Sequence, residues 1–172
     1  MAKVKVKPKA IIDTSFWIHL VKLDLVEQFI QLWDLIATKK VEEELQAFTR
    51  IKLYTPLDLE TYNDLKSQGA IQVKDPKSVP GNINSQIANN SGELFSIALA
   101  KEYKIIVFID NGIPYDFCKR NQILAANIVD YLMRQYEQKK FTKEQILQKL
   151  MILESLKSMK LKYIDKARKE LM

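Results

Sequence analysis

Two short apolar runs that each end in aspartate constrain the fold of this chain more than any other feature. Ala10-Ile11-Ile12 leads into Asp13, and an apolar run over 105–109 leads into Asp110. A short apolar run is typical of a strand buried on both faces, as in a parallel sheet. Two such strands would deliver their carboxylates to one edge of the sheet, and that edge is where open α/β sheets bind ligands.

The rest of the pattern alternates predicted helices with predicted strands. Apolar residues at helical spacing (Val21, Leu25, Phe29, Leu32 and Ile36) predict a helix over 20–36, and similar patterns predict helices over 40–49, 56–66, 90–103, 115–121 and 127–136. Short strands are expected at 51–54, 70–73 and 123–125, and residues 74–90 are expected to form a long loop. This alternation predicts an α/β fold, a three-layer α/β/α sandwich with a central parallel sheet.

The C-terminal region is expected to add a helical hairpin. Thr142 and Gln145 have the spacing of a capping box at the start of a helix, in which Ile146, Leu150, Leu153 and Leu156 would face inward. A bend over 157–162 would lead into a last helix containing Ile164, Ala167 and Leu171. We therefore expect residues 1–136 to form the main domain and residues 137–172 to form an extension packed on it.

The charge and composition of the chain favour a polyanionic partner and exclude several kinds of site. The net charge is +6, and residues 137–172 hold ten Lys and Arg against five Asp and Glu, which favours a polyanionic partner. Lysines at positions 3, 5, 7 and 9 form a second basic patch, and solvated surface is the alternative for both patches. The single Cys118 excludes an internal disulfide and a Cys-rich zinc site, and the single His19 is expected to be structural. No run of 18 apolar residues occurs, so we expect a cytoplasmic protein that does not contact membranes.

Two glutamates between the aspartates complete a candidate acidic site. On the predicted helix over 40–49, Glu43 points away from the apolar face, whereas Glu44 lies on its flank. Glu93 lies near the start of the next long helix. Each acidic residue also has a simpler explanation: Asp13 as a helix N-cap, Asp110 as a turn residue, Glu44 as part of a solvated face and Glu93 as the partner of Asn90 in a capping box.

The four acidic segments, taken in order, resemble the motifs of the PIN-domain family of nucleases. The segments are Ile-Ile-Asp13-Thr-Ser15, Val41-x-x-Glu44-Leu45, Gly92-Glu93-x-x-Ser-Ile-Ala-Leu-Ala100 and Phe-Ile-Asp110-Asn111. They span residues 10–132 together with the alternation of strands and helices. The resemblance implies a PIN-like sandwich, and the C-terminal hairpin resembles extensions of some prokaryotic members.

The resemblance also implies an activity and a set of partners. It implies a Mg²⁺- or Mn²⁺-dependent endoribonuclease in which Asp13, Glu44, Glu93 and Asp110 are catalytic and bind metal. Oxygen ligands alone also suit these hard cations. Ser15 and Asn111 are candidates for hydrogen bonds that orient the carboxylates. Relatives of this kind are often homodimers; many are VapC-like toxins paired with a small antitoxin protein, and others process RNA.

Other functions are considered beside the nuclease. A phosphatase of the haloacid dehalogenase type would need a second aspartate where this chain has Ser15. A catalytically inactive PIN-like scaffold that binds RNA or a protein partner remains the main alternative, and the two differ in whether a divalent metal is required.

Overall fold

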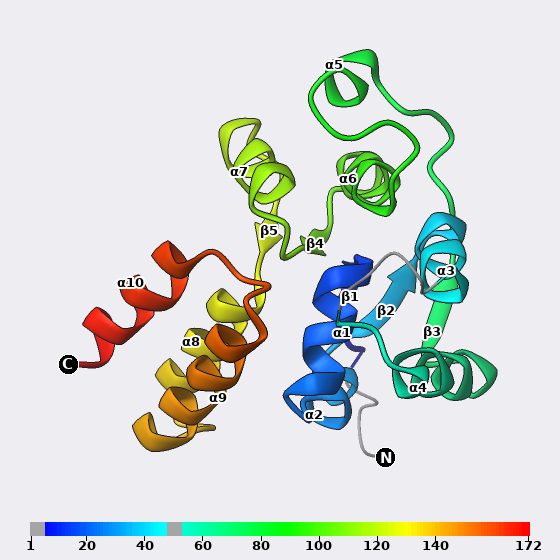
Figure 1. Ribbon diagram of the computed structural model, residues 1–172. Coiled ribbons are helices and arrows are strands. Elements are labelled where there is room, and N and C mark those ends of the chain that lie inside the picture. The colour runs from blue at the N-terminus through cyan, green and yellow to red at the C-terminus, as the bar shows by residue number, and fades with distance from the viewer. Residues whose placement is uncertain (1–5, 48–52) are drawn as a thin grey trace.

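The computed structural model describes residues 6–47 and 53–172 (Figure 1). Its centre is a five-stranded, fully parallel sheet in the order β3-β2-β1-β4-β5. The strands are β1 (Lys9–Ile12), β2 (Asp34–Ala37), β3 (Ile71–Val73), β4 (Ile106–Phe108) and β5 (Ala125–Ala126). The predicted three-layer α/β/α sandwich is confirmed.

Helices cover both faces of this sheet. They are α1 (Thr14–Lys22), α2 (Val26–Leu32), α3 (Lys39–Gln46), α4 (Pro56–Ser67), α5 (Gly81–Asn84), α6 (Gly92–Tyr103), α7 (Gly112–Arg120), α8 (Ile128–Glu137), α9 (Lys143–Leu156) and α10 (Leu161–Leu171). Side chains that alternate along the strands feed two cores: Ile12 packs with α1, α2 and α8, whereas Ile11 packs with α6 and α7 on the other face. The apolar runs are therefore buried on both sides, as their composition predicts.

The order of the strands creates a switch point beside β1. The chain proceeds from β1 outward through β2 to β3, and then returns to place β4 on the other side of β1. The registers pair Ile12 with Phe108, and the Asp13 amide donates to the Phe108 carbonyl at 3.1 Å. Open α/β sheets bind ligands at the carboxyl edge beside such a switch point. Asp13 and Asp110 follow the two strands that flank it.

Several predicted elements differ from the observed ones. The helix predicted over 20–36 is instead α1, α2 and β2, because Asp24 adopts a left-handed conformation (φ 53°) and Trp33 is extended. Ile36 therefore lies in the sheet. Of the strand predicted over 51–54, residues 51 and 52 lie outside the described residues, and Leu53 and Tyr54 form no strand.

Two further differences concern loops. The loop predicted over 74–90 contains the short helix α5, which buries Ile83 in the core shared with α6. The last strand comprises Ala125 and Ala126 rather than 123–125. Phe48, predicted to extend the apolar face of α3, lies outside the described residues.

The C-terminal hairpin shares the larger core. The capping box of Thr142 and Gln145 opens α9 as predicted. Ile146, Leu150 and Leu153 are buried, whereas Leu156 is only partly buried. Figure 1 shows α9 and α10 beside α8, and Ile164, Ala167 and Leu171 bury the inner face of α10. Within residues 6–47 and 53–172, no helix combines the length and the apolar character needed to cross a bilayer.

We expect Leu150→Ala to lower the free energy of unfolding by about 2–5 kcal/mol, because it leaves a cavity in the shared core. Chemical denaturation followed by circular dichroism would measure it. Met151→Ala is the matched control, since Met151 is exposed on the same helix, and it should change stability by less than about 0.5 kcal/mol. If Leu150→Ala leaves the main transition unchanged, the hairpin does not stabilise the sheet domain.

Candidate active site

Asp13 is a buried carboxylate at the end of β1 and the start of α1. Its Oδ1 accepts from the Phe16 amide at 2.9 Å, so it caps α1, and its Oδ2 accepts from the Ser15 hydroxyl at 2.7 Å. The side chain is only 1% exposed. Burial, followed by repulsion from Glu93 and Asp110, raises the pKa of Asp13 well above its ordinary value, although the two hydrogen bonds oppose this shift. The N-cap role and the acidic-site position thus coexist in one residue.

Asp110 follows β4 and is held by a histidine from α1. Its Oδ1 accepts from the Ile128 amide at 2.7 Å, and its Oδ2 lies 2.5 Å from His19 Nδ1. His19 Nε2 lies 2.6 Å from the hydroxyl of Ser158, in the loop between α9 and α10. The tautomer with a hydrogen on Nδ1 donates to Asp110 and accepts from the Ser158 hydroxyl at Nε2. His19 therefore has a structural role, and it contacts one of the four carboxylates at the carboxyl edge of the sheet. We call this region, with Asp13, Glu44, Glu93 and Asp110, the acidic edge.

Glu44 projects from α3 toward the first turn of α6. Its Oε1 accepts from the Gly92 amide at 2.7 Å, and its Oε2 accepts from the Thr14 hydroxyl at 2.5 Å. A Cβ atom at position 92 would lie 2.5 Å from Glu44 Oε2, so glycine leaves room for the carboxylate. Burial is the main cause that raises the pKa of Glu44; the two hydrogen bonds lower it and Glu93 raises it again. Glu43, as predicted, is exposed.

Glu93 lies in the first turn of α6 and faces α7. Its Oε1 accepts from the Asn111 side-chain amide at 3.2 Å. The capping box proposed for Asn90 and Glu93 is wrong, because Ser91 is the N-cap of α6 and Asn90 has a left-handed backbone (φ 56°). The Glu93 carboxylate therefore does not cap α6, and it faces the acidic edge instead. Ser15 and Asn111 both make the predicted hydrogen bonds to carboxylates.

The four carboxylates belong to one edge but do not form a compact ligand cage. Asp13 interacts electrostatically with Glu93 and Asp110, and Glu44 interacts with Glu93. In the described part of the chain, however, no three His, Cys, Asp or Glu side chains are grouped so that they could hold a metal ion. The convergence is looser than predicted, because each carboxylate is turned toward a local hydrogen-bond donor.

The sequence analysis missed three contributors to this edge. Thr14 follows Asp13 directly and donates to Glu44. His19 had one usable signal, a lone histidine in the apolar segment Phe16-Trp17-Ile18-His19-Leu20, which the structure buries. Ser158 gave no signal, because its contact with His19 spans 139 positions of the chain.

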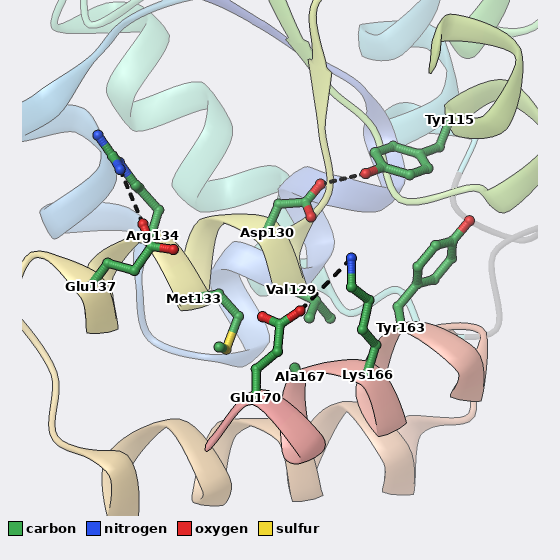
Figure 2. A pocket seen from close by; sticks show the side chains of 10 residues that line it. All are labelled: Tyr115, Val129, Asp130, Met133, Arg134, Glu137, Tyr163, Lys166, Ala167 and Glu170. Atoms are coloured by element: carbon green, nitrogen blue, oxygen red, sulfur yellow. Dashed lines mark hydrogen bonds and ion pairs between the residues drawn. The ribbon is translucent and has the colours of Figure 1, made fainter. Parts of the chain in front are cut away.

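A pocket of about 470 Å³ lies away from this edge, between α8 and α10. Figure 2 shows its polar side chains in pairs: Tyr115 donates to Asp130, Arg134 pairs with Glu137, and Lys166 pairs with Glu170. Its remaining lining is mainly apolar, including Val129 and Ala167. Because these charged groups have partners, the pocket adds no strong charge beside the hairpin.

Comparisons with known proteins leave the family open. No family model matches the chain, and no curated protein matches it. Among solved structures, the chain is similar to a domain of a functionally unknown protein from Methanocaldococcus jannaschii DSM 2661, with 26% identity and a TM-score of 0.47. The match covers 70% of this chain and 91% of that one. At that TM-score the likeness carries no argument about function, so the proposals below depend on the geometry of the acidic edge.

We expect Asp13→Asn to stabilise the metal-free protein at neutral pH, because burial and repulsion from Glu93 and Asp110 penalise the charged carboxylate. A raised folded-state pKa means that protonated Asp13 stabilises the fold, fully below its ordinary pKa of 3.8 and progressively less as pH rises through the folded value. Asparagine keeps the cap and removes the charge. Unfolding in EDTA across this pH range would therefore show the variant gaining on the wild type as pH rises.

The control for this measurement is Asp64→Asn, which changes an exposed aspartate on α4. It should leave both stability and its pH dependence nearly unchanged. An Asp13→Asn protein that is less stable than the wild type at neutral pH would show that the hydrogen bonds of Asp13 outweigh its repulsion.

Proposed function

We propose that the protein is a divalent-metal-dependent nuclease that hydrolyses phosphodiester bonds in RNA. The observation that carries the proposal is the placement of Asp13 and Asp110 just after β1 and β4, the two strands that flank the switch point of the sheet. Glu93 and Asp110 raise the pKa of buried Asp13, so the edge concentrates negative charge that a cation would relieve. The proposed location is the cytoplasm.

The residues present fit the chemistry of a hard cation. The candidate ligands are all carboxylates, which suit Mg²⁺ or Mn²⁺ and not zinc. Asp13 and Asp110 would hold the cation directly, with Glu93 completing the site or acting through a water, and Glu44 would hold a second cation or a metal-bound water. When bound, such a cation activates water as a nucleophile and stabilises the charge that develops on the phosphoryl group.

The protein's own contribution is to fix the orientation of the carboxylates. Ser15 and the Phe16 amide fix Asp13, while His19 and the Ile128 amide fix Asp110. These donors lie at helix starts and on a buried histidine. They therefore hold the carboxylate oxygens of Asp13 and Asp110 in fixed positions before any ligand binds. Hydrogen bonds of this kind orient ligands and tune their affinity for metals.

The choice of RNA and of partners depends on the resemblance of the four acidic motifs to PIN-domain nucleases. Residues 137–172, with a net charge of +5, would attract a nucleic-acid backbone. On the same resemblance we extend the proposal to a homodimer and to either a toxin paired with a small antitoxin or a nuclease of RNA processing.

A second candidate function is a catalytically inactive scaffold that binds RNA or a protein. One observation favours it: all four carboxylates accept internal hydrogen bonds, and in the described residues no group of three is arranged to hold a metal. A scaffold would bind its partner equally well with and without divalent metal.

We expect the protein to cleave RNA in Mg²⁺ or Mn²⁺ and not in EDTA, because hydrolysis requires the cation to stabilise the transition state. A mixed-sequence RNA ladder resolved on denaturing gels would show this. Asp13→Asn should lower the rate by at least about a hundredfold, a loss typical of removing a group that stabilises transition-state charge. Asp64→Asn should cleave as the wild type does. Binding of RNA that is insensitive to metal, with no cleavage, would support the scaffold.

We also expect millimolar Mg²⁺ or Mn²⁺ to raise the melting temperature, since a ligand that binds only the folded state stabilises it by mass action. At a hundred times the dissociation constant the gain is about 2.7 kcal/mol. Differential scanning calorimetry in matched ionic strength would measure the shift. Asp13→Asn should reduce it and Asp64→Asn should retain it. Equal shifts in all three proteins would place the bound cation elsewhere.

A further inference from the structure

The loop between α9 and α10, residues 157–160, is held against the acidic edge. Ser158 contacts His19 at 2.6 Å, and His19 contacts Asp110 at 2.5 Å, so one continuous chain of side chains joins the loop to Asp110, which follows β4. Met159 is buried in the larger core, which fixes the loop from the other side. The hairpin thus supplies part of the edge itself.

The side chain of Lys160 lies directly over the start of α7. A Cβ atom at Gly112 would lie 2.4 Å from Lys160 Cε and 2.6 Å from its Nζ, so the lysine fills the space that glycine leaves. Gly112 follows Asn111, whose amide donates to Glu93. The ammonium group is therefore positioned beside two of the proposed catalytic segments.

Among the described residues, Lys160 directly precedes α10 and has no carboxylate partner, in contrast to three cations of that helix. Lys162 pairs with Asp116, Arg168 pairs with Glu154 and Lys166 pairs with Glu170, the last shown in Figure 2. Within residues 6–47 and 53–172, no carboxylate lies within 4.0 Å of the Lys160 ammonium. Lys160 does help to lower the pKa of Asp116 electrostatically. Lys162 has the same effect, and it also donates a hydrogen bond to Asp116.

We propose that Lys160 binds a backbone phosphate of a single nucleic-acid strand at the acidic edge. The proposal rests on the proposed function and assigns the hairpin a role in it: the hairpin carries a cation to a surface whose other functional groups are carboxylates. A phosphodiester strand cannot approach four carboxylates without added positive charge. A bound cation would supply part of that charge, and Lys160 supplies more beside it.

The hydrogen-bonded chain from Ser158 to Asp110 makes Ser158 and His19 positioning residues for this lysine. Ser158 and His19 hold the loop in place, and the loop in turn fixes the position of the Lys160 backbone, from which the side chain extends. Gly112 acts in the same way from α7, because only a residue without a side chain leaves the ammonium where it is.

The test measures binding of a fluorescein-labelled oligouridylate by fluorescence anisotropy over a series of KCl concentrations, with Ca²⁺ as the divalent cation. Lys160→Gln should weaken binding about three- to tenfold at low salt and reduce the slope of log K against log salt by about 0.7, the value for one lost phosphate contact on a single strand. Lys169→Gln removes the same charge from an exposed position near the end of α10, and it should leave the slope nearly unchanged.

Gly112→Ala provides a second variant that keeps every charge. The added methyl displaces the flexible end of Lys160, so binding should weaken in the same direction while the melting temperature stays close to that of the wild type. Equal effects of Lys160→Gln and Lys169→Gln would overturn the proposal, as would unchanged binding by Gly112→Ala.

Cleavage assays separate this proposal from the proposed function. If Lys160→Gln and Gly112→Ala weaken binding selectively but the wild type cleaves no RNA in Mg²⁺ or Mn²⁺, the nuclease proposal fails and the phosphate contact stands. If the wild type cleaves RNA and both variants bind and cleave as it does, the nuclease stands and the role of Lys160 is overturned.

Discussion

The burial of Asp13 at the junction of β1 and α1 is the constraint around which the edge of the sheet is organised. A carboxylate that is 1% exposed and repelled by Glu93 and Asp110 is tolerated only with compensating contacts. Two hydrogen bonds from its own helix start supply part of the compensation. The pKa of Asp13 is raised by this environment, and carboxylates with perturbed pKa values are typical of sites where charge serves a function.

The same edge is assembled from distant parts of the chain. Thr14 fixes Glu44 from α3, and His19 joins Asp110 to Ser158 in the C-terminal loop. The two glycines at this edge, Gly92 and Gly112, admit the end of a charged side chain, a carboxylate in one case and an ammonium in the other. Helix starts therefore do more than cap helices here: they bring opposite charges close to one edge of the sheet.

The acidic residues and the architecture could be predicted from the sequence for identifiable reasons. Short apolar runs ending in aspartate predicted β1 and β4, because strands buried on both faces leave a recognisable composition. Helical spacing placed Glu43 in solvent and Glu44 on the flank of its helix. The helix predicted over 20–36 was wrong, because a continuous apolar pattern hid the left-handed residue Asp24 and the strand containing Ile36.

The sequence by itself determined that β1 and β4 are buried, that carboxylates follow them and that the chain carries a basic C-terminal region. Local periodicity and composition carry that information, since burial and charge are properties of single residues and near neighbours. Only the tertiary structure decided that Ser158, His19 and Asp110 form one chain of contacts, and that Lys160 lies over Gly112. Those contacts depend on how the hairpin packs on the sheet domain, and a hydrogen bond between residues 139 positions apart leaves no periodic pattern in the sequence.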